Sequence, residues 1–95
     1  MAQHDVISRI RQLKPWLSDH GVTRVRVFGS HARGDARADS DVDIVADFDD
    51  PPGLFELCRL ERTLSERLGA PVDLAVASGL KPRLAEVVER EGVDV

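Results

Sequence analysis

Three aspartates stand on segments whose apolar alternation predicts β-strands. Asp41 and Asp43 belong to the run DVDIVADF at residues 41–48, and Asp73 belongs to VDLAV at residues 72–76. Side chains two residues apart on a strand share a face, so Asp41 and Asp43 should project together, and Asp73 joins them if the two strands are neighbours. Grouped carboxylates repel one another unless a cation or an arginine lies between them. Divalent cations such as Mg²⁺ prefer oxygen ligands, so the three together could bind two metal ions, whereas each motif alone would more often face water.

The pair Gly29-Ser30 stands where the apolar run VTRVRVF ends. A glycine lets the backbone turn tightly and approach a ligand closely. Ser30 can cap the helical turn that follows, which leaves backbone N–H groups for an anion. Arg33 and Arg37 are close enough in sequence to meet phosphate charge. His31 is expected to be a surface side chain rather than a ligand, and an ordinary strand-to-helix turn remains an alternative interpretation of the pair.

The elements that must position these residues alternate between helices and strands. The expected elements are a helix over 6–17 that kinks or restarts at Pro15, a strand over 22–28, a short helical turn and loop over 30–40, a strand over 41–48, a helix over 54–68, a strand over 72–76, a helix over 80–88 and a short edge strand within 92–95. This order predicts an α/β fold, with a three- to four-stranded mixed sheet and helices packed on it, in a single domain over residues 1–95.

The composition is that of an ordinary globular domain. Hydrophobic residues make up 42% and charged residues 32%, and the net charge is -4. An acidic balance argues against binding to duplex nucleic acid, where a basic surface is expected. The single cysteine, Cys58, excludes an internal disulfide, and its helical context predicts a core position. The N-terminal region has no apolar stretch of the kind found in a signal peptide or a membrane span. We therefore expect a cytoplasmic protein with no membrane partner.

These motifs together resemble the nucleotidyltransferase family of the DNA polymerase β superfamily. The family pattern is Gly-Ser, ten residues and then D-x-D, which is the spacing of Gly29-Ser30 and Asp41-Val42-Asp43. The spelling GSHARGDARADSDVDIVADF is similar to the minimal nucleotidyltransferases, the antitoxins of HEPN/MNT toxin–antitoxin pairs. Asp73 in PVDLAV matches the third carboxylate of the family. The resemblance covers residues 5–95 and implies a domain like the palm of polymerase β.

The resemblance also implies a reaction and its site residues. ATP would bind with its phosphates over Gly29, Ser30 and Arg33. Two Mg²⁺ ions, for which Mn²⁺ can substitute, would be held by Asp41, Asp43 and Asp73. An acceptor hydroxyl would attack the α-phosphate, and pyrophosphate would leave. Asp73 would coordinate the metal on the nucleophile side and help to deprotonate the hydroxyl.

The acceptor is expected to be another molecule, because 95 residues leave no room for a substrate domain. The resemblance implies a small helical HEPN-type ribonuclease toxin as partner, neutralised by transfer of AMP. One alternative is an antitoxin without transferase activity that neutralises the toxin by binding. Another is a small-molecule nucleotidyltransferase that needs a partner subunit. Both a homo-oligomer and a hetero-oligomer are compatible with the sequence.

Overall fold

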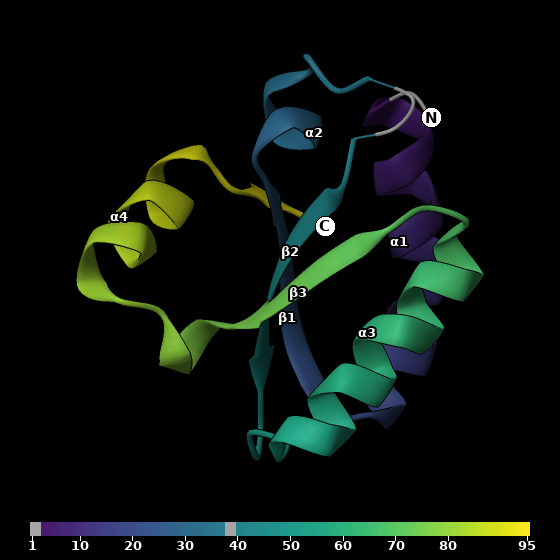
Figure 1. Ribbon diagram of the computed structural model, residues 1–95, viewed down its shortest axis with the longest axis vertical. Coiled ribbons are helices and arrows are strands. Elements are labelled where there is room, and N and C mark those ends of the chain that lie inside the picture. Colours follow the sequence, from purple (N-terminus) through teal and green to yellow (C-terminus); the bar gives the residue numbers. More distant parts are fainter. Residues whose placement is uncertain (1–2, 38–39) are drawn as a thin grey trace.

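The computed structural model describes residues 3–37 and 40–95. In this part of the chain, four strands form one mixed sheet, with helices on both sides and a short helix, α2, at one end (Figure 1). The elements in chain order are α1 (Gln3–Asp19), β1 (Val22–Phe28), α2 (Ser30–Arg33), β2 (Val42–Phe48), α3 (Leu54–Leu68), β3 (Val72–Val76), the 3₁₀ turn η1 (Ala77–Gly79), α4 (Pro82–Glu91) and β4 (Val93–Asp94). The predicted order of helices and strands is therefore confirmed.

The strand order is β3-β2-β1-β4. Strand β1 pairs antiparallel with β2 on one side and with the short β4 on the other. Strands β2 and β3 pair in parallel, and the chain crosses between them through α3. A parallel pair needs such a crossover, because a tight turn can join only antiparallel neighbours. The sheet is thus mixed, as predicted, and has the upper of the two expected strand numbers.

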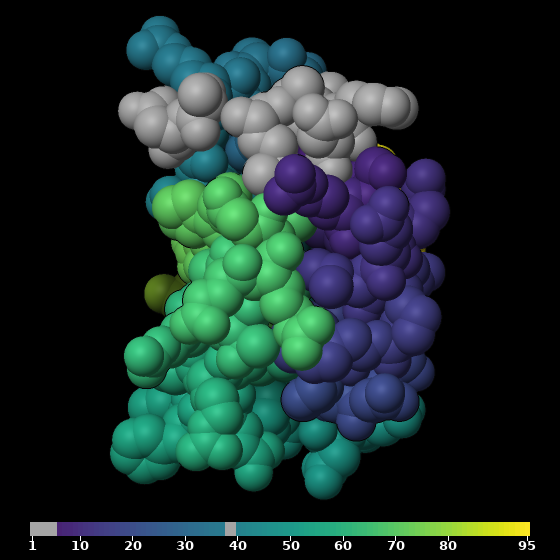
Figure 2. Space-filling model, turned by 90° about the vertical axis from the view of Figure 1, so that its right-hand side faces the viewer, coloured from purple at the N-terminus to yellow at the C-terminus, as the bar shows by residue number. Residues whose placement is uncertain are grey.

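Helices α1 and α3 lie side by side and cover one face of the sheet (Figures 1 and 2). Both helices repeat apolar residues at steps of three and four, and the strands add every second residue, so the apolar surfaces of the two layers meet. The buried residues of this core are Val6, Ile10, Leu17, Val22, Val25, Val27, Val42, Ile44, Ala46, Leu60, Leu64, Leu68, Val72 and Leu74.

The opposite face of the sheet is covered only in part, by α4 (Figure 1). Val45 of β2 and Val88 of α4 are buried, at 0% and 1% exposure, yet neither belongs to the main core. Alternation along β2 puts Asp43 and Asp47 on this same face. The face of the sheet that carries Asp43 is therefore covered by α4 over part of its length and open at one end.

The first helix does not restart at Pro15, so this part of the expectation was wrong. Helix α1 runs without a break from Gln3 to Asp19 with Pro15 inside it. A proline removes the hydrogen bond to the carbonyl four residues earlier, which here belongs to Arg11. Both Pro15 and Arg11 are exposed, so water can supply the missing bond.

A further expectation about burial was wrong. Cys58 is exposed, because the buried stripe of α3 follows Leu60, Leu64 and Leu68 and Cys58 lies off that stripe. Leu84 of α4 is 41% exposed, since α4 covers the sheet with little more than Val88. Among the described helices, none combines the length and the apolar character that a membrane crossing requires.

Candidate active site

Asp43 and Asp73 are brought together by the parallel pairing of β2 and β3. They are direct partners in the register of the two strands. Neighbouring strands lie about 4.8 Å apart, and residues in register on parallel strands share a face. The two carboxylates therefore stand beside each other on the face that α4 leaves open. Local alternation predicts the face, and the strand pairing supplies the proximity.

Asp41 lies just outside the sheet rather than on β2. Strand β2 begins at Val42, so the expectation that Asp41 sits on the strand is corrected by one residue. Its side chain is exposed, and its orientation is set by the loop that leads into β2. It still lies near enough to Asp43 for its charge to act on that carboxyl.

The electrostatics of Asp43 are those of a crowded acidic site. Burial raises the pKa of Asp43 above its ordinary value of 3.8, and the negative charges of Asp73 and Asp41 raise it further. His31 and Arg33 oppose this rise in the pKa of Asp43. Asp43 thus has two carboxylates and two basic side chains around it. Such a mixture of charges can bind a cation through the carboxylates and a polyphosphate through the basic side chains.

Gly29 lies directly against Asp43. Its backbone has φ 75° and ψ -149°, in a region that only glycine adopts readily. A Cβ at Gly29 would overlap Oδ2 of Asp43 and would stand 3.3 Å from its Cγ. The absence of a side chain at Gly29 is therefore what allows the Asp43 carboxylate to approach the turn. The turn from β1 into α2 therefore passes directly against the Asp43 carboxylate.

Ser30 begins α2 and does not cap it. The N-cap is Gly29, and no side-chain cap hydrogen bond is made, so the expected capping role of Ser30 was wrong. The first N–H groups of a helix have no carbonyl partner within that helix, so those of Ser30 and His31 remain available at the turn. The carbonyl of Gly29 accepts from the N–H of Arg33 at 3.1 Å.

The two arginines expected to meet phosphate are both exposed. Arg33 lies near Asp43, and its Nε is paired with Asp35 at 3.4 Å. An exposed ion pair of this kind contributes little to stability, so Arg33 can exchange Asp35 for a phosphate at small cost. Arg37 is tied to the loop by its backbone N–H, which donates to Oγ of Ser40 at 2.8 Å.

His31 is buried, and the expectation of a surface side chain was wrong. Only 2% of it is exposed, because α2 packs against β1, β2 and α1. Its Nε2 lies 3.4 Å from the carbonyl oxygen of Ser40. Nothing in the spacing of the polar segment 30–40 distinguishes a buried histidine from an exposed one.

Two residues of α3 that the sequence did not single out hold the strand of Asp73. Ser65 Oγ accepts a hydrogen bond from the N–H of Val72 at 3.0 Å, and Glu61 Oε2 accepts one from Leu74 at 2.8 Å. These N–H groups lie on the outer edge of β3, where no strand pairs with them. Side chains of α3 thus fix the backbone on both sides of Asp73. The i, i+4 spacing of Glu61 and Ser65 is that of any helix surface, so no sequence signal marks them.

The oxygen donors of this site fit a divalent cation. Asp43 carries a pKa raised by two neighbouring negative charges, which a bound cation would neutralise. Among residues 3–37 and 40–95, no three Asp, Glu, His or Cys side chains are placed so that they could together hold a metal ion. Asp41, Asp43 and Asp73 are therefore not arranged as a complete ligand set, and the exposed side chains of Asp41 and Asp73 would have to turn toward an ion beside Asp43.

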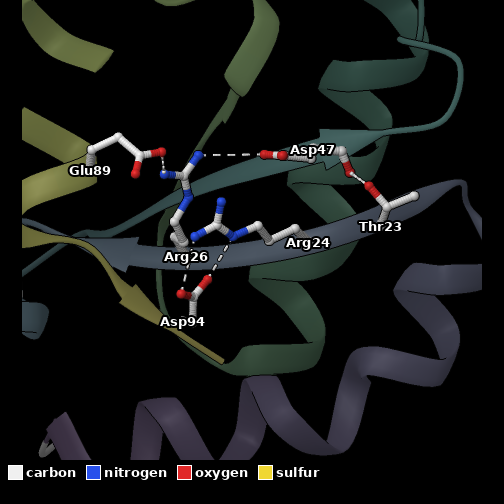
Figure 3. A network of polar contacts seen from close by, with 6 residues as sticks. All are labelled: Thr23, Arg24, Arg26, Asp47, Glu89 and Asp94. Atoms are coloured by element: carbon white, nitrogen blue, oxygen red, sulfur yellow. Dashed lines mark hydrogen bonds and ion pairs between the residues drawn. The ribbon is translucent and has the colours of Figure 1, made fainter. Parts of the chain in front are cut away.

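A polar network ties α4 and the C-terminal strand to the same sheet (Figure 3). Arg26 of β1 is 6% exposed and donates from Nη1 to Glu89 of α4 at 2.8 Å, while its Nη2 forms an ion pair with Asp47 of β2 at 3.5 Å. Arg24 holds Asp94 of β4 with two hydrogen bonds, of 2.8 and 3.1 Å. This pairing raises the pKa of Arg24 and lowers that of Asp94. The network therefore holds α4 and β4 in place on the sheet, next to the face that carries Asp43.

The mixed sheet, the turn at Gly29 and the paired carboxylates of Asp43 and Asp73 agree with the resemblance noted in the sequence. The model of the family described as nucleotidyltransferase domain matches residues 7–95. The chain belongs to this family. Its membership also explains why the resemblance found in the sequence extends over nearly the whole chain.

Curated relatives agree with this membership. The chain is 48% identical over 75 residues to the protein adenylyltransferase MntA of Thermococcus cleftensis, covering 79% of this chain and 76% of that protein. It is 39% identical over 85 residues to a provisionally assigned protein adenylyltransferase of Methanocaldococcus jannaschii, covering 90% and 91% of the two chains.

Solved structures share the fold. A provisionally assigned minimal nucleotidyltransferase superposes with a TM-score of 0.86 at 40% identity, covering 100% of this chain and 97% of its own. A toxin–antitoxin complex with AMP-PNP gives a TM-score of 0.75 at 22% identity, with coverage of 99% and 72%. A complex of a tri-AMPylated HEPN toxin of Shewanella oneidensis with its MNT antitoxin gives 0.74 at 20% identity, with coverage of 94% and 70%. The last two likenesses concern the fold alone.

Proposed function

We propose that this nucleotidyltransferase is a metal-dependent protein adenylyltransferase, the antitoxin of a HEPN-type toxin, which transfers AMP from ATP to a hydroxyl of that toxin. One observation carries the proposal: Asp43 and Asp73 stand in register on parallel strands, with the bare backbone of Gly29 against Asp43. The names of similar proteins support this choice of activity, because one relative is named a protein adenylyltransferase, a second is provisionally assigned as one, and one structural neighbour is an MNT antitoxin in complex with an AMPylated toxin.

The turn at residues 29–31 would receive the triphosphate. Gly29 has no side chain to keep phosphates away, and the N–H groups at the start of α2 can donate to phosphate oxygens. Arg33 would leave its exposed partner Asp35 and meet the phosphate charge, since a guanidinium suits two phosphate oxygens at once. The substrate would thus lie between the turn and the paired carboxylates.

Asp41, Asp43 and Asp73 are the residues that would hold divalent cations. When bound, such ions would stabilise the negative charge that develops on the oxygens of the α-phosphate and of the leaving pyrophosphate. Asp43 has the least freedom, because it is enclosed by Gly29 and the sheet. Asp73 is exposed, so an acceptor hydroxyl arriving from solvent can reach it and pass its proton to the carboxylate.

The test is mass spectrometry of a candidate HEPN-type partner incubated with this chain, ATP and Mg²⁺. Wild type is expected to add the mass of AMP to the partner, and Asp41→Asn with Asp43→Asn in one chain is expected to add none. The matched control is Asp49→Asn with Asp50→Asn, two exposed carboxylates in the loop after β2, which should leave transfer unchanged.

One result would contradict the proposal directly. If wild type adds no nucleotide while the Asp41/Asp43 double variant still neutralises the toxin in cells, the chain is an antitoxin that acts by binding alone. Both variants must first be shown to fold by thermal unfolding. The double variant should be at least as stable as wild type, because two mutually repelling charges are removed.

A further inference from the structure

Asp41 is flanked on both sides by residues whose backbones are hydrogen-bonded to other parts of the site. Asp41 lies between Ser40 and Val42, outside the sheet. On its C-terminal side, the N–H of Val42 donates to the carbonyl of Pro71 at 2.8 Å, which fixes the start of β2 to the start of β3. On its N-terminal side, the carbonyl of Ser40 faces Nε2 of His31 at 3.4 Å. The orientation of Asp41 therefore depends on Val42, which is anchored by Pro71 just before β3, and on Ser40, which is anchored by Arg37 and by His31 of α2.

His31 is an unusual residue to find in this position. It is 2% exposed, and its Nδ1 is buried without a hydrogen-bond partner among the described residues. A carbonyl oxygen can only accept, so Nε2 must carry the hydrogen, and in the neutral ring Nδ1 is then an acceptor with nothing to accept. A leucine would fill the same space without a buried unpaired nitrogen. The buried imidazole therefore has a cost to folding, and a functional role for its hydrogen bond to Ser40 would account for that cost.

His31 connects the turn at Gly29-Ser30 with the loop that carries Asp41. It stands in α2, directly after Gly29-Ser30, and it is near enough to Asp43 to act on it electrostatically. Ser40 is in turn tied to Arg37, whose carbonyl accepts from the Ser40 N–H at 3.0 Å. A hydrogen bond from His31 to Ser40 therefore links the phosphate-binding turn to the loop of Asp41.

We propose that His31 is a positioning residue that fixes Asp41 for metal binding by donating a hydrogen bond from Nε2 to the carbonyl of Ser40. This rests on the proposed function, in which Asp41 is a metal ligand. A ligand that is already oriented loses less freedom when the ion binds, so the anchor raises affinity without touching substrate. Asp43 is held by the sheet ladder and does not need this anchor.

Two substitutions separate the hydrogen bond from the packing. In His31→Leu the buried space is filled but the donor is lost, whereas in His31→Gln the side-chain amide can still donate to Ser40. His20→Leu is the matched control, because His20 is an exposed histidine in the turn directly after α1. Calorimetric titration of each variant with ATP at a series of Mg²⁺ concentrations gives the affinity and its metal dependence.

We expect His31→Leu to weaken Mg²⁺-dependent ATP binding by about tenfold, the order of one net hydrogen bond, and His31→Gln to stay within about threefold of wild type. The unfolding temperature of His31→Leu should equal or exceed that of wild type, because the unpaired nitrogen is gone. Unchanged binding in His31→Leu would overturn the proposal. Equal losses of binding in the Leu and Gln variants, in step with lost stability, would also overturn it by assigning His31 a packing role.

A second measurement needs no nucleotide. Backbone NMR of the free proteins should show altered shifts and faster amide exchange at Asp41 in His31→Leu but not in His31→Gln or His20→Leu. If wild type binds no ATP with Mg²⁺, the proposed function fails, and the NMR result alone decides whether the anchor exists. An Asp41 amide that is the same in all four proteins would refute the anchor.

Discussion

Replacing Gly29 with alanine tests the contact on which the site depends. The change adds a Cβ where φ is 75°, and that atom would overlap the carboxylate of Asp43. Two separate effects follow. The backbone strain belongs to folding and amounts to about 1–3 kcal/mol. The displacement of Asp43 belongs to ligand binding, because the carboxylate must turn away from the phosphate turn.

The structure offers a matched control for the strain. Gly21 has φ 85°, and a Cβ there meets nothing within 4 Å. Gly21→Ala should therefore suffer the strain of a positive φ and leave the site intact. For a domain of this size, each kcal/mol lowers the unfolding temperature by about 4–8 °C, so both variants should unfold roughly 5–20 °C below wild type.

Binding should distinguish the two variants. Disturbing the surroundings of a metal ligand typically weakens metal affinity by about 10–100-fold, and Gly29→Ala moves the ligand itself. We expect Mg²⁺-dependent ATP affinity, measured by calorimetry on the folded protein, to fall at least about tenfold in Gly29→Ala and to stay near wild type in Gly21→Ala. If the two variants bind ATP equally well at similar stability, the Gly29–Asp43 contact has no role in the site and this reasoning is refuted.

Three other changes have defined outcomes. The pKa of Asp43 is raised on folding, so the folded state binds the proton more tightly than the unfolded state, and stability falls as pH rises from 3.8 through the folded pKa. Asp43→Asn should therefore unfold at a higher temperature than wild type at pH 7 and lose this advantage at more acid pH. An equal unfolding temperature at pH 7 would contradict the crowding of negative charge around Asp43. Arg26→Met should lower the free energy of unfolding in urea by about 2 kcal/mol, because Asp47 and Glu89 lose their shared partner. Arg24→Met removes the exposed pair with Asp94 and should lower it clearly less. Equal losses in the two variants would show that the burial of Arg26 does not strengthen its ion pairs. Removal of divalent cations with EDTA should weaken ATP binding by roughly tenfold or more, since bare carboxylates repel phosphates, and metal-independent affinity would argue against the carboxylates as metal ligands.

The sequence by itself determined the elements and the faces of the strands. Backbone geometry gives a strand a period of two and a helix a period of 3.6, so the runs at 22–28, 41–48 and 72–76 could be read directly, as could the face shared by Asp43 and Val45. The glycine turn could be read for a similar reason, because a left-handed backbone conformation favours one residue type over all others. The resemblance to the family rested on the spacing between that turn and the aspartates, which is also a local property.

Tertiary structure alone decided which of these faces meet. Asp43 and Asp73 are thirty positions apart, and only the parallel pairing of β2 and β3 makes them neighbours. Arg26 reads as a solvent-facing residue of a half-buried strand, yet α4 covers it and leaves Arg24 exposed. His31 is buried and Cys58 is exposed, the reverse of what was expected for each. The reason is the same, because burial depends on what packs over a position and the local period of the sequence does not contain that information.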